Sequence, residues 1–163
     1  ASNGLHTNGY SLVRLLMDKM PQIKLDKIDG LTFIEQIMKP HTPYYKAIKD
    51  LPDKSLIHGM AHITGGGIEG NLRRIIPDSL SAKIDLSKIR ILNIFKYIRN
   101  NGGISDKEML RTFNCGVGIC MVVSESGKVM VMKHINQFYE CYEIGRIEKG
   151  ENKVVFENRM SWL

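Results

Sequence analysis

Apolar residues recur along the first part of the chain at the three- and four-residue spacing of a helix face. The first such set comprises Val13, Leu16, Met17 and Met20. It predicts a helix over residues 11–20, which Asn8 or Ser11 would cap. Thr32 and Glu35 form a capping-box pattern that predicts a second helix, ending before Pro40. Pro43 is typical of the start of a third helix.

The rest of the chain mixes strand-like and helix-like patterns. Alternating or β-branched runs predict strands at residues 56–64, 81–86 and 117–123, and a closing hairpin at 141–147 and 154–156. Helical spacing predicts helices at 71–76 and 91–100, and Ser105 with Glu108 forms a second capping box. Residues 129–139 fit both periods and favour a helix. About five strands and five or six helices predict an α+β fold built in layers.

Size and charge place the chain in a broad class. Its 163 residues fit one domain, numbered 1–163, and Lys and Arg exceed Asp and Glu by 23 to 17. The net charge of +6 is typical of a solvated surface, and no basic block interleaved with aromatics indicates nucleic-acid binding. We expect no membrane span and no signal peptide. The three cysteines form no CxxC pair, which favours reduced thiols in a cytoplasmic protein.

Three consecutive glycines provide the first candidate site. Thr64, Gly65, Gly66 and Gly67 follow an apolar strand and precede a helix-like segment. Glycine permits positive φ and close approach of a ligand to the backbone, so the free N–H groups there could hold a phosphate. No Gly-Lys-Ser/Thr follows, so this is not a P-loop, and a plain turn is the alternative.

Two further polar segments are candidates. Gly4, His6 and Asn8 lie just before the first helix, where a neutral His6 could take a proton and Asn8 could contact an amide-rich substrate. Simple helix capping by Asn8 is the alternative. Asn114 and Gly116 either contribute to the site or form a tight turn before a buried strand.

The histidines and cysteines of the sequence give weaker signals. His58 and His62 are four residues apart on one predicted strand, but no third ligand accompanies them in the sequence. We therefore expect no metal site. Cys115 lies next to Asn114, yet no base partner for it is apparent, so a nucleophilic role is disfavoured.

Taken in order, three segments resemble one enzyme family. They are residues 2–14, residues 61–68 with Asn71, and residues 108–118, and residues 142–147 follow. The order and spacing resemble the C-terminal half of the aminoimidazole ribonucleotide synthetase (phosphoribosylformylglycinamidine cyclo-ligase) family. The resemblance implies a three-layer α/β/α domain with a mixed sheet and partly ferredoxin-like topology. Residues 41–46 depart from the family's usual Pro-Thr-Arg pattern.

The resemblance also implies a reaction. This family uses ATP to close formylglycinamidine ribonucleotide to aminoimidazole ribonucleotide in purine biosynthesis, with Mg²⁺ screening the ATP phosphates. Its N-terminal half, which supplies most of the ATP site, is absent from this chain, so we expect the chain alone to be inactive and the full-length enzyme to be a homodimer. The alternatives are a non-catalytic phosphate- or nucleotide-binding module and another ATP-dependent synthetase of the same superfamily.

The predicted site residues fall into two groups. The candidate catalytic residues are His6 and Asn8. The candidate substrate- or phosphate-binding residues are Gly4, Thr64, Gly65, Gly66, Gly67, Asn114 and Gly116.

Overall fold

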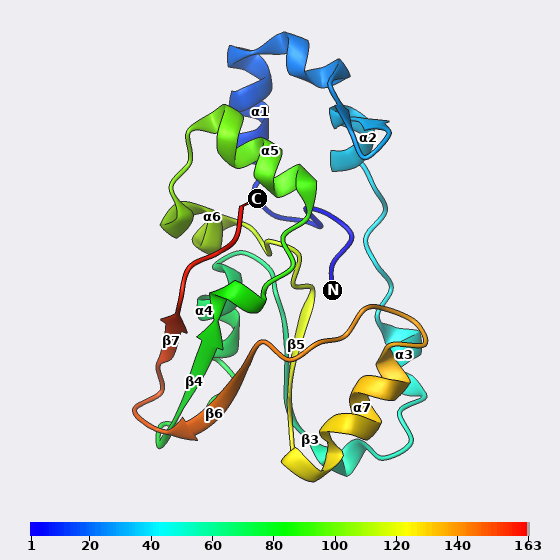
Figure 1. The fold of residues 1–163 in the computed structure, drawn as a ribbon, viewed down its shortest axis with the longest axis vertical. Helices are drawn as coiled ribbons and strands as arrows, with labels where there is room; N and C mark the ends of the chain where they lie inside the picture. The colour runs from blue at the N-terminus through cyan, green and yellow to red at the C-terminus, as the bar shows by residue number, and fades with distance from the viewer. Residues whose placement is uncertain (163) are drawn as a thin grey trace.

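The computed structural model describes residues 1–162, whose longer strands form two sheets. One sheet pairs β3 (Ile57–His62) with β5 (Ile119–Val123) in antiparallel register, with His62 opposite Ile119. The other is mixed: β4 (Leu80–Asp85) lies between the antiparallel β6 (Gly145–Lys149) and the parallel β7 (Val154–Glu157). Figure 1 shows the two sheets next to each other below α1 and α5. The predicted α+β class is confirmed.

The helices surround these sheets. The α-helices are α1 (Tyr10–Lys19), α2 (Phe33–Ile37), α3 (Tyr45–Lys49), α4 (Gly67–Leu72), α5 (Asn93–Gly102), α6 (Asp106–Thr112) and α7 (Lys128–Ile135). Short 3₁₀ turns occupy Pro21–Leu25, Lys54–Leu56, Leu86–Lys88 and Glu125–Gly127. None of the helices within residues 1–162 has the length and hydrophobicity needed to cross a membrane.

The two predicted capping boxes differ in completeness. At α2, Thr32 Oγ1 accepts from Glu35 N at 3.2 Å, and Glu35 Oε2 accepts from Thr32 N at 2.7 Å, so the box is complete. At α6, Ser105 accepts from Glu108 N, but the Glu108 carboxylate instead accepts from Arg111 and Thr112. The second pattern therefore gives a capped helix without the reciprocal bond.

Three local predictions were wrong. Helix α1 begins after Gly9, whose φ is +83°, and neither Asn8 nor Ser11 caps it. Helix α4 begins at Gly67 rather than at residue 71. The last two strands do not form a hairpin, because both pair with β4, which lies between them. A short hairpin was not predicted: β1 (Lys27–Ile28) pairs with β2 (Leu31–Thr32), each strand being two residues long.

That small hairpin has a clear local cause. Asp29 and Gly30 connect its strands, and both have positive φ, +49° and +80°. An Asp-Gly pair with this geometry is the favoured two-residue connection between antiparallel strands.

Two hydrophobic clusters hold the molecule together. The larger one includes the fully buried Phe33, Phe95 and Phe113 and contains residues from α1, α2, α4, α5 and both larger sheets. The smaller one packs α3 against α7 through Ala47, Leu51, Val131 and Ile135. The larger cluster supports the N-terminal segment and α4, the elements that carry the candidate site.

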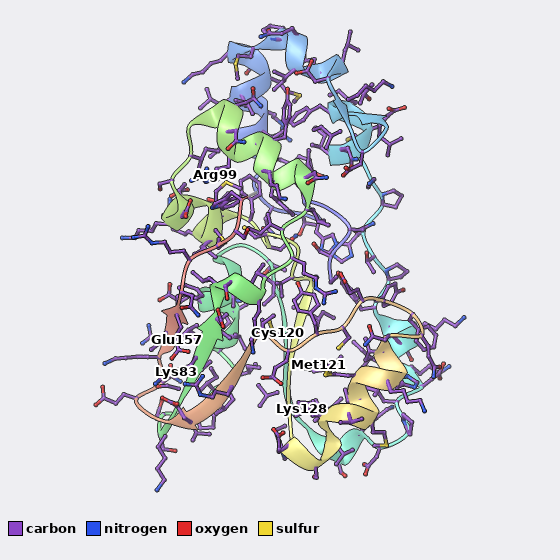
Figure 2. The ribbon with its side chains drawn as sticks, viewed as in Figure 1. Lys83, Arg99, Cys120, Met121, Lys128 and Glu157 are labelled. Carbon is purple, nitrogen blue, oxygen red and sulfur yellow. The ribbon has the colours of Figure 1, made fainter. Side chains whose placement is uncertain are left out.

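An apolar cavity of about 520 Å³ separates the two larger sheets on the side of α7. Figure 2 labels Cys120 and Met121 on β5 and Lys128 at the start of α7, all of which line it. Lys83 and Glu157 lie on β4 and β7, where Lys83 Nζ also forms a 2.7 Å ion pair with Glu148. The cavity therefore lies between the clusters and away from the glycine-rich loop.

Candidate functional site

The glycine loop, residues 64–67, connects the end of β3 to α4. Gly66 and Gly67 both have positive φ, +93° and +62°, which allows the chain to turn directly from strand to helix. The Asn71 side chain holds this turn from inside: its Nδ2 donates to the carbonyl oxygens of Gly67 at 2.8 Å, Thr64 at 3.2 Å and Gly65 at 3.3 Å. Its Oδ1 accepts from Thr64 Oγ1 at 3.1 Å. Asn71 is buried, so it fixes the loop's shape.

The glycines of this loop have different surroundings. A Cβ on Gly67 would lie 1.7 Å from the Leu110 carbonyl oxygen of α6, and the Gly67 N–H donates to Thr64 O at 3.0 Å. Gly67 therefore packs against the scaffold. Within residues 1–162, no protein group accepts a hydrogen bond from the N–H of Gly65 or Gly66. Those two exposed residues retain donors that an anion could use.

The structure brings the N-terminal segment to this loop. Asn8 Oδ1 lies 3.1 Å from the position that a Cβ on Gly65 would occupy. Because Asn8 does not cap α1, its amide makes only a long 3.4 Å bond to Thr7 Oγ1. Two of the three segments predicted to form a site are thus adjacent, with an amide beside the exposed part of the glycine loop.

The third segment is joined to the first by a buried amide. Asn114 Oδ1 accepts from Ser2 Oγ at 2.7 Å and from Gly116 N at 2.8 Å, while its Nδ2 donates to Gly4 O at 2.8 Å. Gly116 has a φ of +106°, and a Cβ there would lie 2.4 Å from the Arg90 carbonyl oxygen. Asn114, Gly4 and Gly116 therefore hold the N-terminal segment against the α6–β5 turn, near the upper end of β5 in Figure 1.

Three histidines meet beside the glycine loop, and we call His6, His41 and His62 the histidine cluster. His6 belongs to the N-terminal segment, His41 to the α2–α3 connection and His62 to the end of β3. The His41 and His62 Nε2 atoms are 3.2 Å apart, and the His6 and His41 rings stack with centroids 3.8 Å apart. One ring nitrogen from each residue lies within 4.8 Å of the others.

Burial and mutual repulsion keep two of these rings uncharged. Desolvation, followed by the nearby His41 and His62, lowers the pKa of His6 to about 4. Burial and the adjacent His41 also lower the pKa of His62. His6 and His62 are therefore neutral near pH 7 and can act as proton acceptors or metal ligands. His6 also has a φ of +58°, unusual for a residue with a side chain.

The structure gives His62 neighbours that its sequence pattern did not indicate. A metal role for His62 with His58 was considered and disfavoured from the sequence, whereas the folded chain places His62 with His6 and His41. One feature of the sequence indicated that His41 is unusual: it lies in residues 41–46, which depart from the family's Pro-Thr-Arg pattern. Asn71 and Ser2 were also left out of the predicted site, although both build it through hydrogen bonds.

The buried cysteines do not add a nucleophile to this region. Cys115 and Cys120 are buried, and desolvation raises the pKa of each thiol to about 12. Both thiols are protonated at neutral pH, which disfavours nucleophilic attack.

Comparison with known proteins identifies related sequences over almost the whole chain. A family model described as "AIR synthase related protein, C-terminal domain" matches residues 1–158. The phosphoribosylformylglycinamidine cyclo-ligase of Streptococcus pneumoniae strain Taiwan19F-14 is 42% identical over 156 residues, covering 95% of this chain and 45% of that protein. The same-named protein of strain Hungary19A-6 is 41% identical over the same shares. The chain therefore spans less than half the length of these curated relatives.

Proposed function

The chain belongs to the family of AIR synthase related proteins, as their C-terminal domain, and we propose that it is the C-terminal half of an ATP-dependent phosphoribosylformylglycinamidine cyclo-ligase. The proposed reaction closes formylglycinamidine ribonucleotide to aminoimidazole ribonucleotide. The similarity to curated cyclo-ligases along 95% of the chain supports this assignment. The alternative of a non-catalytic phosphate-binding module becomes an outcome of the test below.

The observation that carries the proposal is the meeting of three sequence-distant segments. Asn8 faces Gly65, and Asn114 ties Gly4 to the α6–β5 turn. Isolated turns or caps would not require these contacts. The result is one surface with free backbone N–H donors, the Asn8 side-chain amide, which does not cap a helix, and neutral imidazoles. Such a surface suits an anionic, amide-rich substrate.

The proposed chemistry assigns a limited role to each group in this chain. The formyl oxygen attacks the γ-phosphorus of ATP and ADP leaves; an internal nitrogen then attacks the activated carbon, and phosphate leaves with that oxygen. The N–H groups of Gly65 and Gly66 would hold a substrate phosphate, and Asn8 would orient the amidine. His6 would accept the proton that the attacking nitrogen loses, at its free Nδ1.

Mg²⁺ does not fit the residues described here. Mg²⁺ prefers an octahedral set of oxygen ligands. In residues 1–162, the only group with metal-ligand geometry is the histidine cluster, which offers nitrogen alone. We therefore assign Mg²⁺ and most of the ATP contacts to the part of a full-length cyclo-ligase that this chain does not cover.

A chimaera tests the proposal directly. This chain would replace the matching segment of the Streptococcus pneumoniae cyclo-ligase, and ADP release would be followed with formylglycinamidine ribonucleotide as substrate. We expect steady turnover by the folded chimaera and none by the 163-residue chain alone, because phosphoryl transfer needs nucleotide, metal and acceptor held together. A folded chimaera that binds substrate but never turns over would favour the non-catalytic module.

A matched pair of variants assigns the role of Asn8. In the chimaera, Asn8→Ser should lower kcat/KM about tenfold, which corresponds to about 1.4 kcal/mol. Asn101→Ser is the control, since the exposed Asn101 lies on α5 and donates only to Tyr97 O. Equal kinetics for both variants would remove Asn8 from the site.

A further inference from the structure

We propose that His6, His41 and His62 bind a divalent transition-metal ion such as Zn²⁺, a site beyond the cyclo-ligase function proposed above. The ion would use the same His6 Nδ1 lone pair that the proposed reaction uses as proton acceptor, so the two roles exclude each other while the ion is bound. The three residues lie on separate segments and meet only in the folded chain, where one nitrogen of each lies within 4.8 Å of the others. Three histidines from separate elements are a ligand set that Zn²⁺ uses in proteins, with a fourth position left for water.

The distances suit such an ion. Zn–N bonds of about 2.0–2.1 Å at tetrahedral angles separate two ligand nitrogens by roughly 3.3–3.4 Å. The Nε2 atoms of His41 and His62 are 3.2 Å apart, so this pair already has nearly the required separation. A ring nitrogen of His6 lies within 4.8 Å of the other two, and binding of all three to one ion requires the stacked His6 and His41 rings, whose centroids are 3.8 Å apart, to separate.

The outer hydrogen bonds point lone pairs inward. His41 Nδ1 lies 2.9 Å from the Thr42 carbonyl oxygen, which can only accept, so Nδ1 carries the proton and Nε2 keeps its lone pair toward His62. Metal-binding histidines commonly donate their other N–H to a carbonyl in this way, which fixes the tautomer and the ring orientation.

His6 is held in the same manner. Its Nε2 lies 3.0 Å from Asn3 Oδ1, and the Asn3 amide is oriented because its Nδ2 donates to Pro40 O at 2.8 Å. The proton therefore resides on His6 Nε2. Its Nδ1 is buried, carries a lone pair and has no partner within the described residues. Only 8% of His6 is exposed, so this is a buried acceptor for which a ligand is the missing partner.

The donor set selects the kind of ion. Imidazole nitrogens suit Zn²⁺, Co²⁺, Ni²⁺ and Cu²⁺, whereas Mg²⁺ and Ca²⁺ require carboxylate, carbonyl or water oxygens. The cluster contains three nitrogens and no carboxylate. We therefore expect selectivity for Zn²⁺-like ions over Mg²⁺.

The test is a metal titration of the metal-free 163-residue chain, which requires neither ATP nor substrate. Co²⁺ would be followed by its visible absorption and Zn²⁺ by competition against it, and we expect one ion per chain. Loss of a partner residue that hydrogen-bonds to a metal ligand typically weakens metal binding by roughly 10- to 100-fold. His41→Gln and His62→Gln remove ligands themselves, so each should weaken binding by more than that. Asn3→Ala, which removes such a partner, should weaken it by roughly 10-fold.

His58→Gln is the matched control. His58 is exposed on the same strand as His62 and lies outside the cluster. Thermal unfolding would verify that each variant folds, and His41 and His62, which are more exposed than His6, carry the test. The proposal is overturned if the folded chain binds no ion, or if His58→Gln weakens binding as much as His41→Gln. Inactivity of the chimaera would leave this titration unchanged, so the two proposals fail separately.

Discussion

The glycine loop and the histidine cluster are neighbours built in opposite ways. His62 ends β3, and Thr64 begins the loop two residues later. The loop is shaped by backbone: positive φ at two glycines, and one buried amide that bonds three of its carbonyls. The cluster is shaped by side chains from three segments, and two of its members are exposed.

Because of this difference, we expect substitutions in the two regions to affect different properties, stability in one and ligand binding in the other. Gly67 contacts α6 so closely that it is part of the fold and accepts few substitutions. In the histidine cluster, His41 and His62 contribute rings near solvent, and we expect their replacement to leave the surrounding packing largely in place. We therefore expect variants of Gly67 and of Asn71, which holds the loop, to lose stability, and variants of His41 and His62 to lose ligand binding.

The largest effect should come from Gly67→Ala. The added Cβ would lie 1.7 Å from the Leu110 carbonyl oxygen, and the φ of +62° disfavours any side chain. Because backbone must move, we expect a loss of about 3 kcal/mol in the free energy of unfolding. A chain of this size should then show a Tm lower by about 6–12 °C.

Gly70→Ala is the control for this variant. Gly70 lies in the same helix, α4, and a Cβ there meets no atom within 4 Å. Alanine also favours helix over glycine by about 1 kcal/mol, so Gly70→Ala should be neutral or stabilising. Equal unfolding curves for the two variants would show that α6 yields easily, and the loop would then be no more rigid than the cluster.

Asn71→Ala should have the next largest effect. It removes the donor to the Thr64, Gly65 and Gly67 carbonyls and leaves Thr64 Oγ1 without its acceptor. Loss of buried hydrogen bonds predicts a cost of about 2 kcal/mol, measured by urea unfolding. An unchanged midpoint would mean that the glycines alone hold the loop.

The fold was predictable where its cause is local. The Thr32–Glu35 capping box and the Ser105 cap were predicted correctly because a few adjacent residues determine them. The start of α4 was missed because the glycines were interpreted as loop, although Gly67 is already helical. The closing hairpin was wrong because β4, some sixty residues earlier in the chain, lies between β6 and β7. No short pattern encodes that arrangement.

The candidate site likewise has a part that local sequence determines and a part that depends on long-range contacts. The glycine loop could be predicted from the sequence because consecutive glycines indicate backbone with positive φ. That Asn8 reaches Gly65, and that Asn114 binds Gly4, required the folded chain. His41 could not have been placed with His62, because the two are 21 residues apart and on different elements. The residue roles proposed for His6 and Asn8 stay predictions until the chimaera is measured.

The smallest effect on stability should come from His41→Gln, which tests the other half of the comparison. His41 is exposed, and its hydrogen bonds are to the carbonyl of the next residue and to His62. Exposed substitutions of this kind stay within about 0.5 kcal/mol, so the Tm should move by no more than about 2 °C. Calorimetry of the metal-free chain would measure this shift. A fall as large as that of Asn71→Ala would place the His6–His41 stack in the scaffold, and the cluster would then resemble the loop in being built for stability. A small shift combined with lost metal binding would keep the two regions distinct, because only a ligand site loses affinity without losing the fold.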